Sequence, residues 1–416
     1  MLQKPTALAF VSPFEGARGY FLAGLSHYYA LNVYYYTTRR FRFKWQIFHS
    51  WAYDSDVRFT KYTSLQELLN VYSGYDAIFI HPNALTPFFG WYENQKEITE
   101  FVLKMKEKGK KIYWLDTGEV QYHSTSNPDF WDNIDLALKG QVFKKEYEHL
   151  FFDEQKALLF NGPDVMQNET IVAENMKFNF DKYRHKILPC PYVPSITRPK
   201  DLDFSKTKKV YDIAANTRSY GNGILRYRLI REIQNRLDKT YIYSFDYDDK
   251  GWETNAPEGQ KNFDPYLIKT LKLGKLLFKL KYSTYFYPQP LYLHNLSRAK
   301  CFFAPAWCLL SFRNADAWGA GCVLINFSVK KFNYGLPMQD DYNYVSIGER
   351  DEMTDDNESI RPEFIPGIIS KIESILGDGK KQAEIVKNGK AVFQEYYSSP
   401  KQFVKKVFIE RLPQYP

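Results

Sequence analysis

The feature that most constrains this chain is a repeated alternation of short apolar runs with longer segments of helical spacing. In the first half, apolar runs fall at residues 7–12, 76–82 and 111–119, and segments with apolar residues at intervals of three and four separate them. Strands that alternate with helices predict a parallel, doubly wound sheet, because each helix carries the chain back across the sheet. Such a sheet binds ligands at the carboxyl ends of its strands.

The alternation breaks once and then starts again. Residues 187–209 contain four prolines, several charges and little periodicity, which is typical of a linker. Apolar runs at 210–217, 240–245 and 300–305 then restart the pattern, with helical segments between them. The 416 residues also exceed what one ordinary core accommodates. The sequence therefore predicts an α/β protein with two Rossmann-like doubly wound domains that face a cleft.

The predicted domain boundaries follow this break. We expect an N-terminal Rossmann-like domain over residues 1–190 and a linker over 191–208. A C-terminal Rossmann-like domain should span 209–385, and a closing C-terminal helix should occupy 386–416.

Composition narrows the class of partner and the compartment. Lys and Arg total 56 against 48 Asp and Glu, and the net charge of +8 favours polyanionic partners such as nucleotide diphosphates, anionic lipid headgroups or nucleic acid. The four cysteines form no CxxC pair and stand in apolar surroundings, which indicates reduced thiols and a cytoplasmic location. No window approaches the roughly 18 continuous apolar residues of a membrane-spanning helix.

The stretch "RNADAWGAGCVLINFS", residues 313–328, combines a charged helix start with a glycine-hinged apolar strand. Arg313 and Asp316 are three residues apart, so on a helix they project to the same side. A planar guanidinium suits phosphate, and a carboxylate suits the hydroxyl groups of a ribose. The alternative is a solvated ion pair on a helix surface.

Two longer segments resemble a known family. The order "LYLHNLSRAKCFFAPAWCLLSFRNADAWGAGCVLINF" (291–327) is similar to the C-terminal half of the exostosin-like glycosyltransferases, and "VYDIAANTRSYGNGILRYRLIREI" (210–233) is similar to that family's strand, small-residue turn and Arg-bearing helix. The resemblance covers about residues 210–330. It departs from the family at Asp316, where Glu is usual, and at Leu324, where Pro is usual.

The resemblance implies a two-domain glycosyltransferase of the GT-B type. The C-terminal domain would bind the donor, a nucleotide-sugar, with a UDP- or GDP-sugar favoured. The N-terminal domain would bind the acceptor, and the hydroxyl of a glycan or of a lipid-linked molecule would receive the sugar. The expected donor-binding residues are Asn216, Arg218, Arg313 and Asp316. No Asp-x-Asp stands at a strand end, so we expect neither a metal nor another cofactor, with Arg, Lys and helix dipoles replacing the cation.

The N-terminal domain should supply a base and contacts to the acceptor. Inverting transfer needs a carboxylate or imidazole to take the acceptor proton, and Asp116, Glu119 and Glu15 lie at the ends of predicted strands. The alternative for Asp116 is a cap of the next helix. Lys139 and His81 are the candidates for acceptor binding, against the alternatives of a solvated lysine and a packed loop histidine.

Basic segments leave other readings open. Residues 265–285 interleave five lysines with leucine and phenylalanine, which predicts an amphipathic helix suited to an anionic membrane surface, or a surface helix of the domain. A peripheral location on the membrane follows from the first reading. Residues 39–45 add a basic aromatic patch. We expect no nucleic acid partner, but the alternative function is a non-catalytic two-domain binding protein for nucleic acid or anionic glycan. A third possibility is an epimerase.

Overall fold

The computed structural model describes residues 4–11, 16–36, 58–62, 64–82, 84–85, 95–116, 121–161, 163–192, 207–217, 224–234, 240–244, 246–248, 251–253, 296–305, 312–354, 356 and 359–414. The chain divides into two compact units. Unit 1 comprises Met1–Val193, Lys331–Leu336 and Tyr396–Pro416, and unit 2 comprises Pro194–Lys330 and Pro337–Glu395.

Unit 1 is built on a seven-stranded sheet with the strand order β3-β2-β1-β4-β5-β6-β8. All of its neighbouring strands pair in parallel. From β1 the chain winds to β2 and β3 on one side and later to β4 on the other, so the direction of winding reverses between β1 and β4. The strands are β1 Thr6–Val11, β2 Ala30–Tyr36, β3 Arg58–Tyr62, β4 Ala77–Ile80, β5 Lys111–Trp114, β6 Leu136–Lys139 and β8 Ile187–Pro189.

The connections of this sheet contain helices α1 (Gly16–Leu25), α3 (Leu65–Val71), α5 (Gln95–Lys106) and α6 (Pro128–Asn133). In α5 the residues at helical spacing, Ile98, Phe101, Val102 and Met105, are all buried. The apolar stripe that predicts the helix is therefore the stripe that packs against the sheet.

A helical lobe follows β6 and ends at β8. It begins with the short strand β7 (Val142–Phe143), which pairs antiparallel with β15 (Phe332–Asn333). This pairing assigns residues 331–336 to unit 1 although their flanking residues belong to unit 2. The lobe's helices are η2 Lys145–Phe151, α7 Glu154–Asn161, α8 Pro163–Met166, α9 Glu169–Asn175, α10 Phe180–Tyr183 and η3 Arg184–Lys186.

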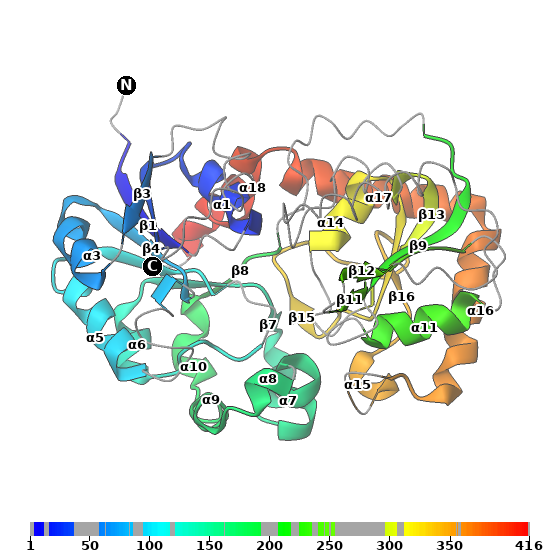
Figure 1. The fold of residues 1–416 in the computed structure, drawn as a ribbon, viewed down its shortest axis with the longest axis horizontal. Helices are drawn as coiled ribbons and strands as arrows, with labels where there is room; N and C mark the ends of the chain where they lie inside the picture. The colour runs from blue at the N-terminus through cyan, green and yellow to red at the C-terminus, as the bar shows by residue number, and fades with distance from the viewer. Residues whose placement is uncertain are drawn as a thin grey trace. The chain divides into compact units, whose positions relative to one another are not determined.

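The C-terminal segment contains two α-helices where one closing helix over 386–416 was expected. Helix α17 (Gly379–Tyr397) is followed by α18 (Pro400–Val407) and by η7 (Ile409–Gln414). The Ser399 hydroxyl caps α18 by accepting from the backbone N–H of Gln402, and Pro400 takes its first position. Helix α18 lies beside α1 in unit 1 (Figure 1). A Cβ at Gly24 of α1 would meet the carbonyl oxygen of Pro400 at 2.2 Å, so the two helices touch through backbone.

Unit 2 contains a five-stranded sheet with the order β10-β9-β13-β14-β16, again parallel throughout. Its direction of winding reverses between β9 and β13. The strands are β9 Tyr211–Thr217, β10 Thr240–Ser244, β13 Ala299–Phe303, β14 Val323–Asn326 and β16 Val345–Ser346. Its helices include α11 Ile224–Gln234, α14 Phe312–Gly319, α15 Arg350–Met353, η6 Pro362–Phe364 and α16 Ile365–Gly377, and β11 Asp246–Asp248 pairs with β12 Gly251–Glu253.

The predicted fold class is confirmed, because each unit is a parallel, doubly wound α/β sheet of Rossmann-like form. Strands β3 and β8 were not anticipated. The basic segments 265–285 and 39–45 lie outside the described residues. Among the residues that the structure describes, no helix combines the length and apolar character needed to cross a membrane.

Candidate functional site

The sequence-predicted residues of unit 1 gather at the carboxyl edge of its sheet. His81 directly follows β4, Asp116 lies two residues beyond β5, and Lys139 is the last residue of β6. Glu15 follows β1 in the sequence but, like Glu119, lies outside the described residues. Strands β1, β4, β5 and β6 are consecutive neighbours in the sheet, so these candidates follow four adjacent strands on the side where parallel sheets bind ligands.

A buried irregular segment, residues 121–126, lies close to this edge. All six of its side chains are buried, although the segment reads Gln-Tyr-His-Ser-Thr-Ser and belongs to neither a helix nor a strand. Buried backbone amides and carbonyls outside regular structure must find partners elsewhere, because an unpaired buried polar group is costly.

Asparagine side chains of the helical lobe supply several of these partners. Asn161 Oδ1 accepts from the backbone N–H of Tyr122 at 2.6 Å. Asn175 pairs with both backbone groups of His123, because its Oδ1 accepts from the N–H at 2.8 Å and its Nδ2 donates to the carbonyl at 3.2 Å. Asn175 thus imitates a neighbouring strand, and α7 and α9 fix the path of the segment.

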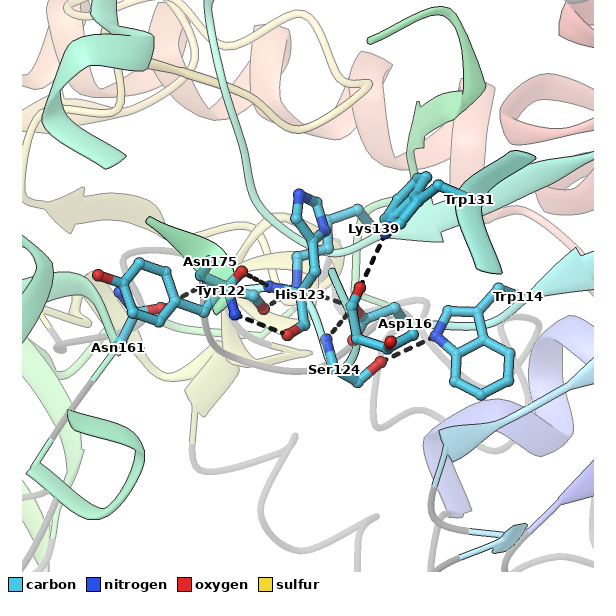
Figure 2. Close-up of polar contacts among 10 residues, drawn as sticks. Trp114, Asp116, Tyr122, His123, Ser124, Trp131, Lys139, Asn161 and Asn175 are labelled. Atoms are coloured by element: carbon cyan, nitrogen blue, oxygen red, sulfur yellow. Dashed lines mark hydrogen bonds and ion pairs between the residues drawn. The ribbon is translucent and has the colours of Figure 1, made fainter. Parts of the chain in front are cut away.

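An enclosed ion pair anchors the segment to the sheet. Asp116 Oδ2 accepts from Lys139 Nζ at 3.1 Å and from the Ser124 backbone N–H at 3.1 Å (Figure 2). Lys139 Nζ also donates to the Tyr122 carbonyl at 2.6 Å, and Trp114 Nε1 donates to Ser124 Oγ at 2.8 Å. Among the described residues, the hydrogen bonds to the Asp116 carboxylate go to Oδ2. The role of Asp116 as a base stays a prediction.

Lys139 is more enclosed than a lysine that reaches into solvent. Its side chain is 1% exposed and that of Asp116 is 5% exposed. Burial lowers the pKa of Lys139, and the neighbouring Asp116 carboxylate opposes that shift. The predicted contact of Lys139 with an acceptor is not visible in this arrangement and stays a prediction. His81 is also buried, with its backbone N–H bonded to the Phe10 carbonyl, and its acceptor role likewise stays a prediction.

His123 occupies an aromatic cage, and neither of its ring nitrogens has a hydrogen-bond partner among the residues that the structure describes. Its ring centroid lies 4.2 Å from that of Phe178, 4.9 Å from Trp131 and 5.6 Å from Phe151. Burial lowers the pKa of the imidazole well below its ordinary value, and the nearby Lys139 ammonium lowers it further. The imidazole is therefore neutral at pH 7.

The predicted donor residues of unit 2 follow the two strands at its winding reversal. Asn216 is the sixth residue of β9, and Arg218 comes directly after that strand, outside the described residues. Arg313 and Asp316 lie on α14, which follows β13. The Asp316 side chain has no exposed surface, so contact with a ribose requires the groups that cover it to move. These four roles stay predictions.

Several residues at these edges were not singled out from the sequence. Asn161 and Asn175 carry no local signal, because their partners lie 39 and 52 residues away. In unit 2, Glu349 and Arg350 follow β16 and are buried, and Glu349 pairs with Lys330 at 2.9 Å. Their signal is a charged "GER" (348–350) that begins two residues after the end of a short strand.

Carboxylates at the two edges are not clustered as metal ligands. Across the described ranges, no group of three or more His, Cys, Asp or Glu side chains is placed to hold a metal ion. The sequence also places Arg218 and Arg313 near the edge of the unit 2 sheet, and guanidinium groups suit an anionic ligand. The ammonium of Lys139, by contrast, is already paired with the Asp116 carboxylate.

No protein-family model matches the sequence, and no curated protein matches it. Solved structures show a broad likeness. The pneumococcal O-GlcNAc transferase GtfA, in complex with UDP and GlcNAc, is 11% identical over 83% of this chain and 58% of its own, with a TM-score of 0.44. The UDP-GlcNAc 2-epimerase of Neisseria meningitidis, bound to UDP-GlcNAc, is 8% identical over 97% of this chain and 100% of its own, with a TM-score of 0.41. Arabidopsis thaliana UGT89C1, complexed with UDP, is 9% identical over 99% of this chain and 100% of its own, with a TM-score of 0.42. At these scores none of them assigns an activity to the chain.

The enclosed ion pair predicts a strong and asymmetric effect on stability. Lys139→Met leaves the Asp116 carboxylate buried without its ammonium, and we expect the free energy of unfolding to fall by about 3–5 kcal/mol. The double variant Asp116→Asn/Lys139→Met should recover most of that loss, because no buried charge remains. Urea denaturation of the three proteins measures both effects.

The exposed pair Lys182–Asp132 provides the matched control, since its side chains are 52% and 45% exposed. Lys182→Met should destabilise far less than Lys139→Met. Equal losses in the two lysine variants would show that the buried pair does not hold unit 1 together.

The caged imidazole predicts a pH dependence of stability. The pKa of His123 is lower in the folded than in the unfolded chain. As the pH falls below about 6.5, the imidazole therefore takes up a proton in the unfolded state while it stays neutral in the folded state. The free energy of unfolding is highest above that pH and decreases below it. Relative to His123→Phe, the wild type should lose up to about 1.4 kcal/mol per pH unit in that range. Denaturation curves recorded at pH values between about 5 and 8 measure the difference in the free energy of unfolding between the two proteins. Parallel pH dependences of stability for the wild type and His123→Phe would contradict the account.

Proposed function

We propose that this protein is a glycosyltransferase that moves a sugar from a nucleotide-sugar donor to an acceptor hydroxyl. The observation that carries the proposal is the placement of the candidate residues. In unit 2 they lie near the end of β9 or after β13, the strands at the winding reversal. In unit 1 they lie at or after the ends of adjacent strands that include both strands at its reversal. Doubly wound sheets bind nucleotides at such reversals.

The donor would bind to unit 2. Arg218 and Arg313 would neutralise the diphosphate, and Asn216 would contact the donor from the end of β9. Asp316 would meet the ribose hydroxyls once the covering groups move. Bidentate Arg contacts and helix N-termini stabilise the developing negative charge of a leaving diphosphate, so the reaction as proposed uses no metal ion.

The acceptor would bind to unit 1, with Lys139 and His81 at its edge. In the transfer, the acceptor oxygen forms a bond to the anomeric carbon while the bond from that carbon to the diphosphate oxygen breaks, and the nucleoside diphosphate leaves with the electron pair. A carboxylate takes the hydroxyl proton. Asp116 is the described candidate, and its Oδ2 is held by Lys139 and Ser124. Glu119 and Glu15 are its rivals.

The proposal also specifies the chemical class of acceptor and donor and the location of the protein in the cell. A glycan or a lipid-linked molecule would supply the hydroxyl, and the donor would be a UDP- or GDP-sugar. The exostosin-like resemblance of residues 210–330 favours these choices. Residues 265–285 would place the protein on an anionic membrane surface from the cytoplasmic side.

A thermal-shift screen against UDP, GDP, CMP, ADP and dTDP without added metal tests the donor site. A nucleotide at 100 times its dissociation constant should stabilise the fold by about 2.7 kcal/mol, and Arg218→Ala should weaken that shift. Arg228→Ala, on the exposed side of α11, is the matched control and should keep the full shift.

Other outcomes separate the alternative functions. Stabilisation by single-stranded DNA or heparin with no response to any nucleotide would overturn the proposal in favour of a non-catalytic polyanion-binding protein. Conversion of a nucleotide-sugar to its epimer without an acceptor would point to an epimerase instead.

A further inference from the structure

Next to the enclosed ion pair, unit 1 contains a small cavity. Its volume is about 10 Å³, enough for roughly one water molecule. The polar side chains that line it are Gln121, His123, Lys139 and Gln141, and the apolar ones are Val142, Phe143, Phe151, Phe180 and Ile187. All of these residues except Val142 are buried.

The wall of the cavity contains a polar group that lacks a partner. The His123 side chain is buried, with 3% of its surface exposed. Neither ring nitrogen makes a hydrogen bond to another described residue. A neutral imidazole carries one N–H donor and one acceptor nitrogen, and buried groups of this kind are nearly always bonded to protein or to ordered water. Of the aromatic rings around His123, those of Phe151, Phe178 and Phe180 carry no hydrogen-bonding group, and the indole N–H of Trp131 already donates to the Thr125 carbonyl at 2.8 Å.

The charges in the wall decide what kind of ligand fits. The Lys139 ammonium is offset by the Asp116 carboxylate at 3.1 Å, and His123 is neutral. The surroundings of the cavity therefore carry no net charge that would hold an ion against the cost of removing it from water. Size and charge together favour a single neutral polar molecule.

We propose that this cavity is a specific site for one ordered water molecule. The water would accept from the N–H of the His123 ring nitrogen that faces the cavity and donate to the side-chain oxygen of Gln121, which also lines the cavity. Gln121 Nε2 donates to Gln141 Oε1 at 2.9 Å, and that oxygen also accepts from the Tyr334 hydroxyl at 3.3 Å.

The water would connect two parts of unit 1 that are far apart in the sequence. On one side stands the buried segment 121–126, and on the other stands Tyr334 in the segment 331–336, reached through the two glutamines. The site would thereby help to fix the segment whose Ser124 N–H holds Asp116. The water site stands whether or not the chain transfers sugars, because it rests on geometry within unit 1.

A crystal structure of the full chain that shows ordered solvent tests the site directly. We expect a solvent peak within about 3.2 Å of one His123 ring nitrogen and of the Gln121 side-chain oxygen. In His123→Phe the peak should be lost while the Asp116–Lys139 contact remains. His185→Phe, at an exposed position, should keep the peak.

An empty cavity in the wild type, or a protein side chain bonded to the His123 ring in its place, would overturn the site. Nitrogen NMR of the chain labelled at its histidine side chains decides the matter even if His123→Phe does not fold. We expect one neutral imidazole resonance with a cross-peak to long-lived water. An imidazolium signal for His123 at pH 7, or no water contact, would equally contradict the site.

Discussion

The enclosed pair of Asp116 and Lys139 is the interaction on which the candidate site of unit 1 depends. It joins the ends of two adjacent strands, β5 and β6, and its carboxylate holds the Ser124 N–H while its ammonium holds the Tyr122 carbonyl. Removing either charge leaves the other uncompensated in a region with little solvent, where an isolated charge is strongly destabilising. The path of the buried segment 121–126 follows from this pair.

The segment 121–126 fills part of the core with polar side chains and irregular backbone, and burying such groups costs free energy unless each of them finds a partner. Its polar side chains are buried, and α7 and α9 must present Asn161 and Asn175 to pair with its backbone. An apolar helix or strand would fill the same space with its backbone groups already paired. Natural chains keep such irregular, polar and buried structure mainly where a site requires it, and this one lies at the edge of the sheet where ligands bind.

Much of the fold could be predicted from the sequence, but less of the site could. The alternation of apolar runs and helical segments predicts the sheets because it reflects local periodicity, as the buried stripe of α5 shows. Strand β8 and helix α18 were missed because their places depend on partners far away in the chain, such as α1 for α18. The burial of Lys139 was missed for the same reason: a lysine at a strand end is usually solvated, and only the Asp116 contact, 23 residues away, explains its enclosure.

The central claim is that a nucleotide binds at the carboxyl edge of the sheet in unit 2. Hydrogen exchange measured by mass spectrometry, with and without the nucleotide that stabilises the protein, tests it most directly because it reports where amides become protected. The account predicts slower exchange in peptides that span the end of β9 and the start of α14. Protection confined to residues 112–143 of unit 1 would contradict it, since the nucleotide would then occupy the edge assigned to the acceptor.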